Sequence, residues 1–183
     1  MESKNSVKPT IINILNQMSE LLNDIDDNTV NHFINMIVNS RSIFLVGAGR
    51  SGLVAKAFAI RLVHLGFPTF VIGETITIPV KKNDLIILIS GSGETIPVTM
   101  TAEIGRRLGA KIISITANPD SHIARFADLP IILKPDKKNS KLAPLGTLFE
   151  ASAWIFLDGI IAELMERKGE NEESMKKRHA TLQ

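Results

Sequence analysis

The fold class of this chain follows from the stretch Asp84-Leu-Ile-Ile-Leu-Ile-Ser-Gly-Ser-Gly-Glu-Thr95. Its unbroken apolar run, residues 85–89, is typical of a strand that is buried on both faces of a parallel sheet. Glycines and hydroxyl residues follow at once, and Pro97 then stands where the first turn of a helix tolerates a missing N–H. Gly109 ends the helical pattern. This order of buried strand, glycine loop and helix is the repeating unit of α/β proteins.

The same order recurs along most of the chain. Helical patterns follow the first, third and fifth of the predicted strands, and the last of these helices is expected at residues 148–167. Because parallel strands need crossover connections, the pattern predicts an α/β protein with a five-stranded parallel sheet and helices on both faces. The four further strands are expected at residues 42–46, 69–72, 111–116 and 129–133.

The flanking segments predict a single domain over residues 1–183. Residues 1–41 carry two helical stripes of apolar side chains and are expected to form a helical lead-in. Residues 42–168 form the α/β core in this interpretation. Residues 169–183 are expected to form a short tail helix with Asn171 as its N-cap and basic residues in its last turn, which suits the helix dipole.

The composition excludes several classes of protein. The 183 residues include no cysteine, which rules out disulfides, thiolate zinc sites and iron–sulfur clusters. The four histidines form no His-x-x-x-His pair, so no metal is expected. With 5% aromatic residues and a net charge of +2, the chain lacks the features of a nucleic-acid binder. The absence of a secretion signal and of an apolar run of about 18 residues predicts a cytoplasmic protein with no membrane partner.

A first glycine loop, Gly47-Ala-Gly-Arg-Ser-Gly52, follows the first predicted strand. Together with Glu74, about twenty residues later, it matches the dinucleotide-binding fingerprint, which makes an NAD-dependent oxidoreductase one alternative. A chain of 183 residues leaves little room for the substrate domain of such an enzyme. We therefore expect Gly49, Arg50 and Ser51 to cover part of a small polar ligand.

The second glycine loop has the chemistry of a phosphate site. Glycines allow close approach, the N-terminus of the following helix is positive, and hydroxyl groups donate hydrogen bonds. The alternative is an ordinary N-cap, for which one hydroxyl residue suffices. Three hydroxyl residues in six exceed that need, so the loop is predicted to bind phosphate. The expected binding residues are Ser90, Gly91, Ser92, Gly93 and Thr95.

Further motifs, in order along the chain, carry a resemblance to a known family. With the loop at residues 90–95, they resemble the 6-phospho-3-hexuloisomerase family of sugar isomerase (SIS) domain proteins, in that order and at similar spacing. The resemblance covers essentially the whole chain. The motifs are Gly47-Ala-Gly-Arg-Ser-Gly52, Arg61-Leu-Val-His-Leu-Gly-Phe67, Gly73-Glu-Thr75, Pro144-Leu-Gly-Thr-Leu-Phe-Glu150 and Arg178-His179.

The resemblance implies an isomerase without cofactor or metal. Its substrate would be D-arabino-3-hexulose 6-phosphate, converted to fructose 6-phosphate through an enediol in the ribulose monophosphate pathway. This pathway serves formaldehyde assimilation or, in reverse, pentose synthesis, and the resemblance implies a functional link to 3-hexulose-6-phosphate synthase. It also implies a homo-oligomer, expected to be a tetramer. A different phosphosugar isomerase and a non-catalytic sugar-phosphate sensor remain as alternatives.

The resemblance implies roles for the carboxylates. Glu150 is expected to be the catalytic base, although its spacing from Thr147 also fits a capping box, in which the glutamate only binds the N-cap amide. Glu74 is expected to contact a substrate hydroxyl. Glu94 lies inside the phosphate loop, where an inward carboxylate would repel phosphate, so a structural role is expected. Trp154 is expected in the core.

His179 is the second catalytic residue that the resemblance implies, in ring opening or proton transfer. The tail that carries it has weak apolar content, chiefly Met175 and Leu182, so we expect it to gain little from packing on its own domain. Such a tail often docks on another subunit. His179 is therefore predicted to enter the active site of a neighbouring subunit, and the alternative is an ordinary exposed histidine.

Overall fold

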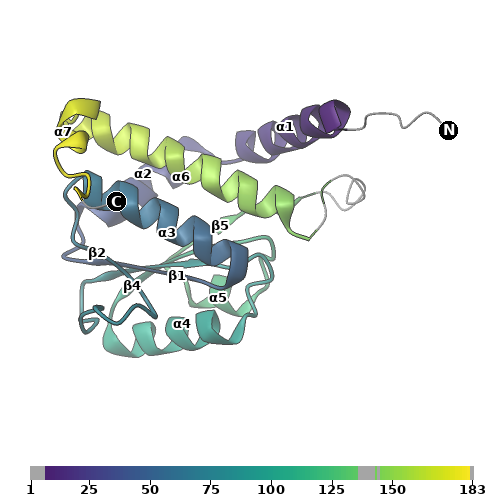
Figure 1. Cartoon of the computed structure of the whole chain (residues 1–183). Helices are drawn as coiled ribbons and strands as arrows, with labels where there is room; N and C mark the ends of the chain where they lie inside the picture. Colours follow the sequence, from purple (N-terminus) through teal and green to yellow (C-terminus); the bar gives the residue numbers. More distant parts are fainter. Residues whose placement is uncertain (1–6, 136–142, 144, 182–183) are drawn as a thin grey trace.

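The computed structural model describes residues 7–135, 143 and 145–181, and it contains the predicted parallel sheet (Figure 1). Its strands lie in the order β2-β1-β3-β4-β5, and every neighbouring pair is parallel. The α/β class and the five-stranded parallel sheet are therefore confirmed. The strands are β1 (Ile43–Gly47), β2 (Thr69–Val71), β3 (Leu85–Ile89), β4 (Lys111–Thr116) and β5 (Leu129–Ile132).

Helices cover both faces of the sheet. Alternate residues of a strand point to opposite faces, so Leu85 and Ile87 join the core beneath α2, α3 and α6, whereas Ile86 and Leu88 pack with α4 and α5. Figure 1 shows these two helical layers on either side of the strands. The helices are α1 (Val7–Asn23), α2 (Asp27–Val38), α3 (Gly49–His64), α4 (Ile96–Leu108), α5 (His122–Phe126), α6 (Thr147–Lys168) and α7 (Glu172–Lys176).

The predicted helix boundaries agree closely with the structure, but one helix was not predicted. Helix α4 has the predicted bounds, and α6 extends one residue further at each end. Helix α5 was missed, because five residues are too few to show a helical period. Its N-cap is Ser121, whose side chain accepts a hydrogen bond from the backbone of Ala124. Among the described residues, no helix combines the length and apolarity needed to cross a membrane. Pro144 and Leu182 lie outside the described residues.

The pairing of β1 with β3 brings the two glycine loops together. Gly47 lies opposite Ile89, so the loops at residues 47–52 and 90–95 leave adjacent strands at the same edge of the sheet. From β1 the chain moves outward to β2, whereas β3, β4 and β5 follow in order on the other side. The boundary between β1 and β3 is therefore the topological switch point, where open parallel sheets bind their ligands.

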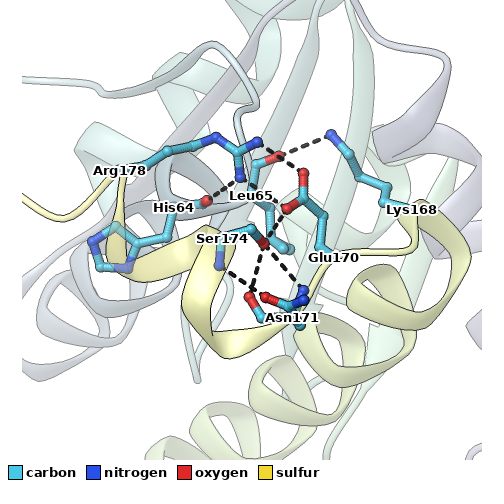
Figure 2. Close-up of polar contacts among 7 residues, drawn as sticks. All are labelled: His64, Leu65, Lys168, Glu170, Asn171, Ser174 and Arg178. Atoms are coloured by element: carbon cyan, nitrogen blue, oxygen red, sulfur yellow. Dashed lines mark hydrogen bonds and ion pairs between the residues drawn. The ribbon is translucent and has the colours of Figure 1, made fainter.

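The C-terminal tail packs on its own chain. Met175 is buried in the main core, and Asn171 and Ser174 form a reciprocal capping box at the start of α7. Figure 2 shows further polar contacts that tie the tail to the end of α3. The expectation that packing on its own domain contributes little to the stability of the tail is therefore wrong. One buried methionine and several hydrogen bonds anchor the tail on that domain.

Candidate active site

The loop after β1 makes a tight turn into α3. Gly49 adopts φ +56°, a conformation that favours glycine. A Cβ at Gly47 would lie 2.7 Å from the backbone of Ser51, so only glycine allows this close approach. Ser51 is buried, whereas Gly49 and Arg50 are exposed at the start of the helix. Of the three binding residues predicted in this loop, Gly49 and Arg50 therefore face solvent at the switch point.

The loop after β3 is held by its own hydroxyl groups. The buried Ser90 Oγ accepts a hydrogen bond from Gly93 N–H (3.1 Å) and lies 3.0 Å from Thr95 Oγ1. Gly93 has φ +69°, and a Cβ there would lie 2.2 Å from Ser121 Oγ. Ser92 is exposed, and its Oγ accepts from Glu94 N–H (3.2 Å). Ser90 thus shapes the loop, and Ser92 is the hydroxyl that faces solvent.

Glu94 does not belong to this cradle. Its Oε1 accepts a hydrogen bond from His122 N–H (2.8 Å), at the first residue of α5. A carboxylate is well placed at the positive N-terminal end of a helix. The structural role expected for Glu94 is therefore confirmed, and its partner is the helix that sequence patterning missed.

Glu150 and Arg50 form the ionic centre of the site. Arg50 Nε donates to Glu150 Oε2, although the two residues are 100 positions apart in the sequence. The Glu150 side chain is only 13% exposed, whereas that of Arg50 is 64% exposed. The preceding residue, Phe149, packs against the second glycine loop, because a Cβ at Gly91 would lie 3.1 Å from its ring. Both glycine loops and the first turn of α6 therefore meet at one place.

The first turn of α6 does not contain the capping box considered above. A capping box requires Thr147 to be the N-cap, but the N-cap is Gly146, in the left-handed conformation (φ +81°), and Thr147 is already helical. Glu150 N–H donates to Gly146 carbonyl oxygen (3.0 Å) as an ordinary helical hydrogen bond. The carboxylate of Glu150 is therefore paired with Arg50, and the cap of α6 receives no side-chain hydrogen bond.

A cavity of about 380 Å³ opens beside this ion pair. Trp154 lines it and is 43% exposed, so the expectation that Trp154 belongs to the core is wrong. One helical turn after Glu150, the indole faces the same side of α6 as the carboxylate. The remaining lining residues are mainly apolar: Met18, Leu53, Val54, Ala151 and Ile155.

Glu74 and His179 lie elsewhere on the same chain. Glu74 Oε1 is paired with Lys56 Nζ (2.6 Å) on a groove of about 510 Å³, which His64 and Arg178 also line. The rings of His64 and His179 are 5.0 Å apart. Within one chain, the predicted site residues therefore form two groups.

Helix α3 sets the separation of these groups. Arg50 lies in its first turn and His64 is its last residue, a span of about 20 Å at 1.5 Å per residue. His179, beside His64, is therefore remote from the Glu150 of its own chain. The contact between His64 and His179 was not predicted, although both residues lie in motifs that carried the resemblance. Within the residues that the structure describes, no group of three histidine, aspartate or glutamate side chains can hold a metal ion.

Comparison with known proteins decides the family. Residues 36–153 match the model of the SIS domain. The chain belongs to the SIS domain family. A Methanocaldococcus jannaschii protein named 3-hexulose-6-phosphate isomerase is 42% identical over 170 residues, which cover 93% of each chain. A Bacillus subtilis protein of the same name is 38% identical over 179 residues, or 94% of this chain and 97% of its own. Among SIS proteins, this chain is thus a member of the 3-hexulose-6-phosphate isomerase family and an enzyme.

Solved structures agree with this assignment. The crystal structure of a Methanococcus jannaschii protein, for which a molecular function of 3-hexulose-6-phosphate isomerase was inferred, superposes with a TM-score of 0.86 at 39% identity. The match covers 93% of this chain and 97% of that one. A phosphoheptose isomerase from Francisella tularensis has a TM-score of 0.73 at 15% identity, over 91% of this chain and 100% of its own, and shows that the fold is shared.

Substitutions of the two serines should separate ligand binding from loop structure. Ser92→Ala removes an exposed hydroxyl, and a hydrogen bond to a charged group contributes about 1.5–3 kcal/mol. We expect the KM of this SIS isomerase to rise roughly 10- to 100-fold with Tm unchanged. Ser90→Ala should also lower Tm, since Ser90 Oγ accepts a hydrogen bond inside the loop. Kinetics and thermal melting test this, with Thr101→Ala on α4 as the matched control. An unchanged KM in Ser92→Ala would remove the loop from the binding site.

Glu150→Gln tests the expected role of Glu150 as the catalytic base and should preserve the fold. The amide keeps the shape of the side chain, and loss of a general base typically costs about 10²–10⁴-fold in rate. We expect kcat to fall within that range and Tm to change little. Glu166→Gln, an exposed substitution on the same helix, is the control. If activity per folded molecule persists in Glu150→Gln, the glutamate serves only the ion pair with Arg50, and Glu74 becomes the next candidate.

Proposed function

We propose that this SIS isomerase interconverts D-arabino-3-hexulose 6-phosphate and fructose 6-phosphate. The observation that carries the proposal is the meeting of Glu150, Arg50 and the Ser90–Thr95 loop at the switch point between β1 and β3, in a chain about 40% identical to proteins named for this isomerisation. The reaction belongs to the ribulose monophosphate pathway, in formaldehyde assimilation or in reverse toward pentoses. In this proposal a 3-hexulose-6-phosphate synthase supplies or consumes the substrate, and both enzymes act in the cytoplasm.

In the proposed mechanism, the phosphate binds at the second glycine loop. The exposed Ser92 and the N-terminus of α4 supply hydrogen-bond donors and the positive end of a helix dipole. Gly91 and Gly93 let the loop pack closely on Phe149 and Ser121, which fixes the backbone that would face the phosphate. Thr95, as the N-cap of α4, completes this cradle.

Glu150 acts as the base in this proposal. Its carboxylate takes the proton from C2 of the 3-hexulose, which leaves a 2,3-enediolate, and returns the proton to C3, which gives the C2 carbonyl of fructose 6-phosphate. The hydroxyl proton moves from O2 to O3, so hydrogen is only redistributed within the substrate. Arg50, already beside the carboxylate, is placed to stabilise the negative charge that develops on the enediolate oxygens.

His179 completes the site from a neighbouring subunit in this proposal. The distance along α3 separates it from the Glu150 of its own chain, and its side chain is exposed. Large apolar side chains also remain exposed on several helices, which supports a homo-oligomer, proposed to be a tetramer. They include Ile11, Ile12 and Leu15 on α1, Leu53, Ile60 and Val63 on α3, and Ile155 on α6.

A substrate panel tests the proposed reaction. The purified protein should convert 3-hexulose 6-phosphate to fructose 6-phosphate. It should show about 100-fold lower kcat/KM with arabinose 5-phosphate, because the loop holds the phosphate at a fixed distance from Glu150 and a shorter sugar misplaces the reacting carbons. Activity should survive dialysis against EDTA, since the proton transfer uses only side chains. Turnover of arabinose 5-phosphate alone would indicate a different phosphosugar isomerase. Ligand-induced stabilisation without turnover of any member would indicate a sensor.

Mixed oligomers test the shared site. The Glu150→Gln and His179→Ala proteins should each retain only a small residual kcat, whereas co-refolded mixtures should recover a much larger fraction of the wild-type kcat. Recovery is expected because some sites then receive an intact residue from each chain. No recovery, in mixtures shown by native mass spectrometry to contain hetero-oligomers, would place His179 outside the neighbour's site.

A further inference from the structure

Two cationic side chains cap the C-terminal end of α3. The carbonyl oxygen of His64 accepts a hydrogen bond from Arg178 Nη1 (3.1 Å), and that of Leu65 accepts one from Lys168 Nζ (2.8 Å). The last carbonyls of a helix have no partner within the helix, and they carry the negative end of its dipole. As Figure 2 shows, these two cations come from the end of α6 and from the residues that follow α7. The C-terminal tail is therefore fastened to the end of α3.

Arg178 is itself held by a carboxylate from the tail. Its Nη1 and Nη2 donate to the two oxygens of Glu170 (3.1 and 2.9 Å), and Ser174 Oγ donates to the same carboxylate. The hydrogen bond from Arg178, with a smaller contribution from Ser174, lowers the pKa of Glu170 to about 2. The carboxylate thus stays ionised throughout the neutral range. We call Glu170, Ser174 and Arg178 the tail clamp.

The residue after the tail clamp is the proposed catalytic histidine. His179 N–H donates to the carbonyl of Lys176 (3.1 Å), and its ring lies 5.0 Å from the ring of His64 at an angle of 30°. His64 therefore contacts the tail at two points. Its carbonyl accepts a hydrogen bond from the guanidinium of Arg178, and its buried ring lies against the ring of His179. Because these contacts hold Arg178 in place, they also set the position of the exposed imidazole of the next residue, His179.

We infer that Arg178 is a positioning residue, which holds the His179 imidazole against His64 and so presents it to the neighbouring active site. The inference rests on the proposed function, in which His179 takes part in the reaction. The physical reason is preorganisation, because an exposed side chain on an unanchored segment loses conformational freedom whenever it reaches its catalytic position. A bidentate guanidinium is needed for this role, and the single ammonium of lysine cannot bind both the carboxylate and the carbonyl in the same geometry.

Kinetics of tail-clamp variants test the inference. Arg178→Lys and Glu170→Gln should each lower kcat about 10-fold with KM changed less than about twofold, since misplacing a reacting group slows the chemical step and substrate binding does not use the tail clamp. Arg167→Gln removes an ion pair with Glu163 elsewhere on α6 and is the matched control. In a His179→Ala background, Arg178→Lys should have no further effect on kcat. An equal further loss in that background, or an unchanged kcat in Arg178→Lys alone, would overturn the inference.

An NMR titration of the His64 imidazole gives a readout that does not depend on activity. Burial lowers the pKa of His64 and is the largest effect. Electrostatic repulsion from His179 and Arg61 lowers this pKa further. Among the described residues, the charged side chains near this ring are Arg61 on α3 and Arg178 on the tail, with Lys56 and Glu74 in the same groove. The titratable imidazole of His179 lies beside it. Releasing the tail removes part of the burial and one repulsion, so Arg178→Lys should raise the pKa of His64 although the charge at residue 178 is kept.

The two measurements distinguish failure of the inference from failure of the proposed function. If His179→Ala lowers kcat but Arg178→Lys leaves the titration of His64 as in the wild type, then Arg178 does not position His179 and the inference is wrong. If His179→Ala leaves kcat unchanged while Arg178→Lys still shifts the pKa of His64, the tail clamp holds His179 as inferred, and the catalytic role of His179 in the proposed function is wrong.

Discussion

The parallel pairing of β1 with β3 is the contact on which the candidate site depends. Each of these strands is a short apolar run buried at the centre of the sheet, and Gly47 lies opposite Ile89 at their carboxyl ends. Because the side chains of a strand alternate between faces, a slip of one residue would exchange the two cores on either side of the sheet. The register is therefore fixed by burial, and with it the common starting point of the two glycine loops.

The ion pair of Glu150 with Arg50 connects this edge of the sheet to α6. Three packing features hold it in place: α6 lies on α3, Phe149 lies against Gly91, and Gly146 gives the chain its left-handed turn into the helix. A residue larger than glycine at position 91 would press on the Phe149 ring, which would have to shift. Glu150 and the second glycine loop are thus coupled by a packing contact as well as by the ligand they are proposed to share.

Helix α3 separates the two groups of residues to which the proposed function assigns chemical roles. Its first turn carries Arg50 at the switch point, and its last residue, His64, receives the tail that carries His179. A helix of this length keeps Arg50 and His64 of one chain apart, which is why the proposed site takes His179 from a neighbouring subunit. The anchoring of the tail on its own subunit is compatible with that arrangement, because the tail clamp uses the backbone of His64 and leaves the side chain of His179 exposed.

Local sequence patterns were enough to predict the α/β class, the five strands, most helix boundaries and the two glycine loops, because these features depend on periodicity and on glycine positions that are read directly from the chain. The resemblance named Glu150 and His179, but no local pattern could place Arg50 beside Glu150, which lies 100 residues away, or exclude the capping box that the spacing of Thr147 allowed. Helix α5 is too short for a periodic signal. Trp154 was expected in the core, but only the folded chain shows that it lines the cavity.

The anchoring of the tail depends on tertiary structure alone. Arg178 binds the carbonyl of His64, more than 100 residues earlier, and Glu170 acts on that contact by holding the guanidinium. Such long-range hydrogen bonds leave no periodic trace in the sequence, because they join side chains to backbone atoms that only the folded chain brings together.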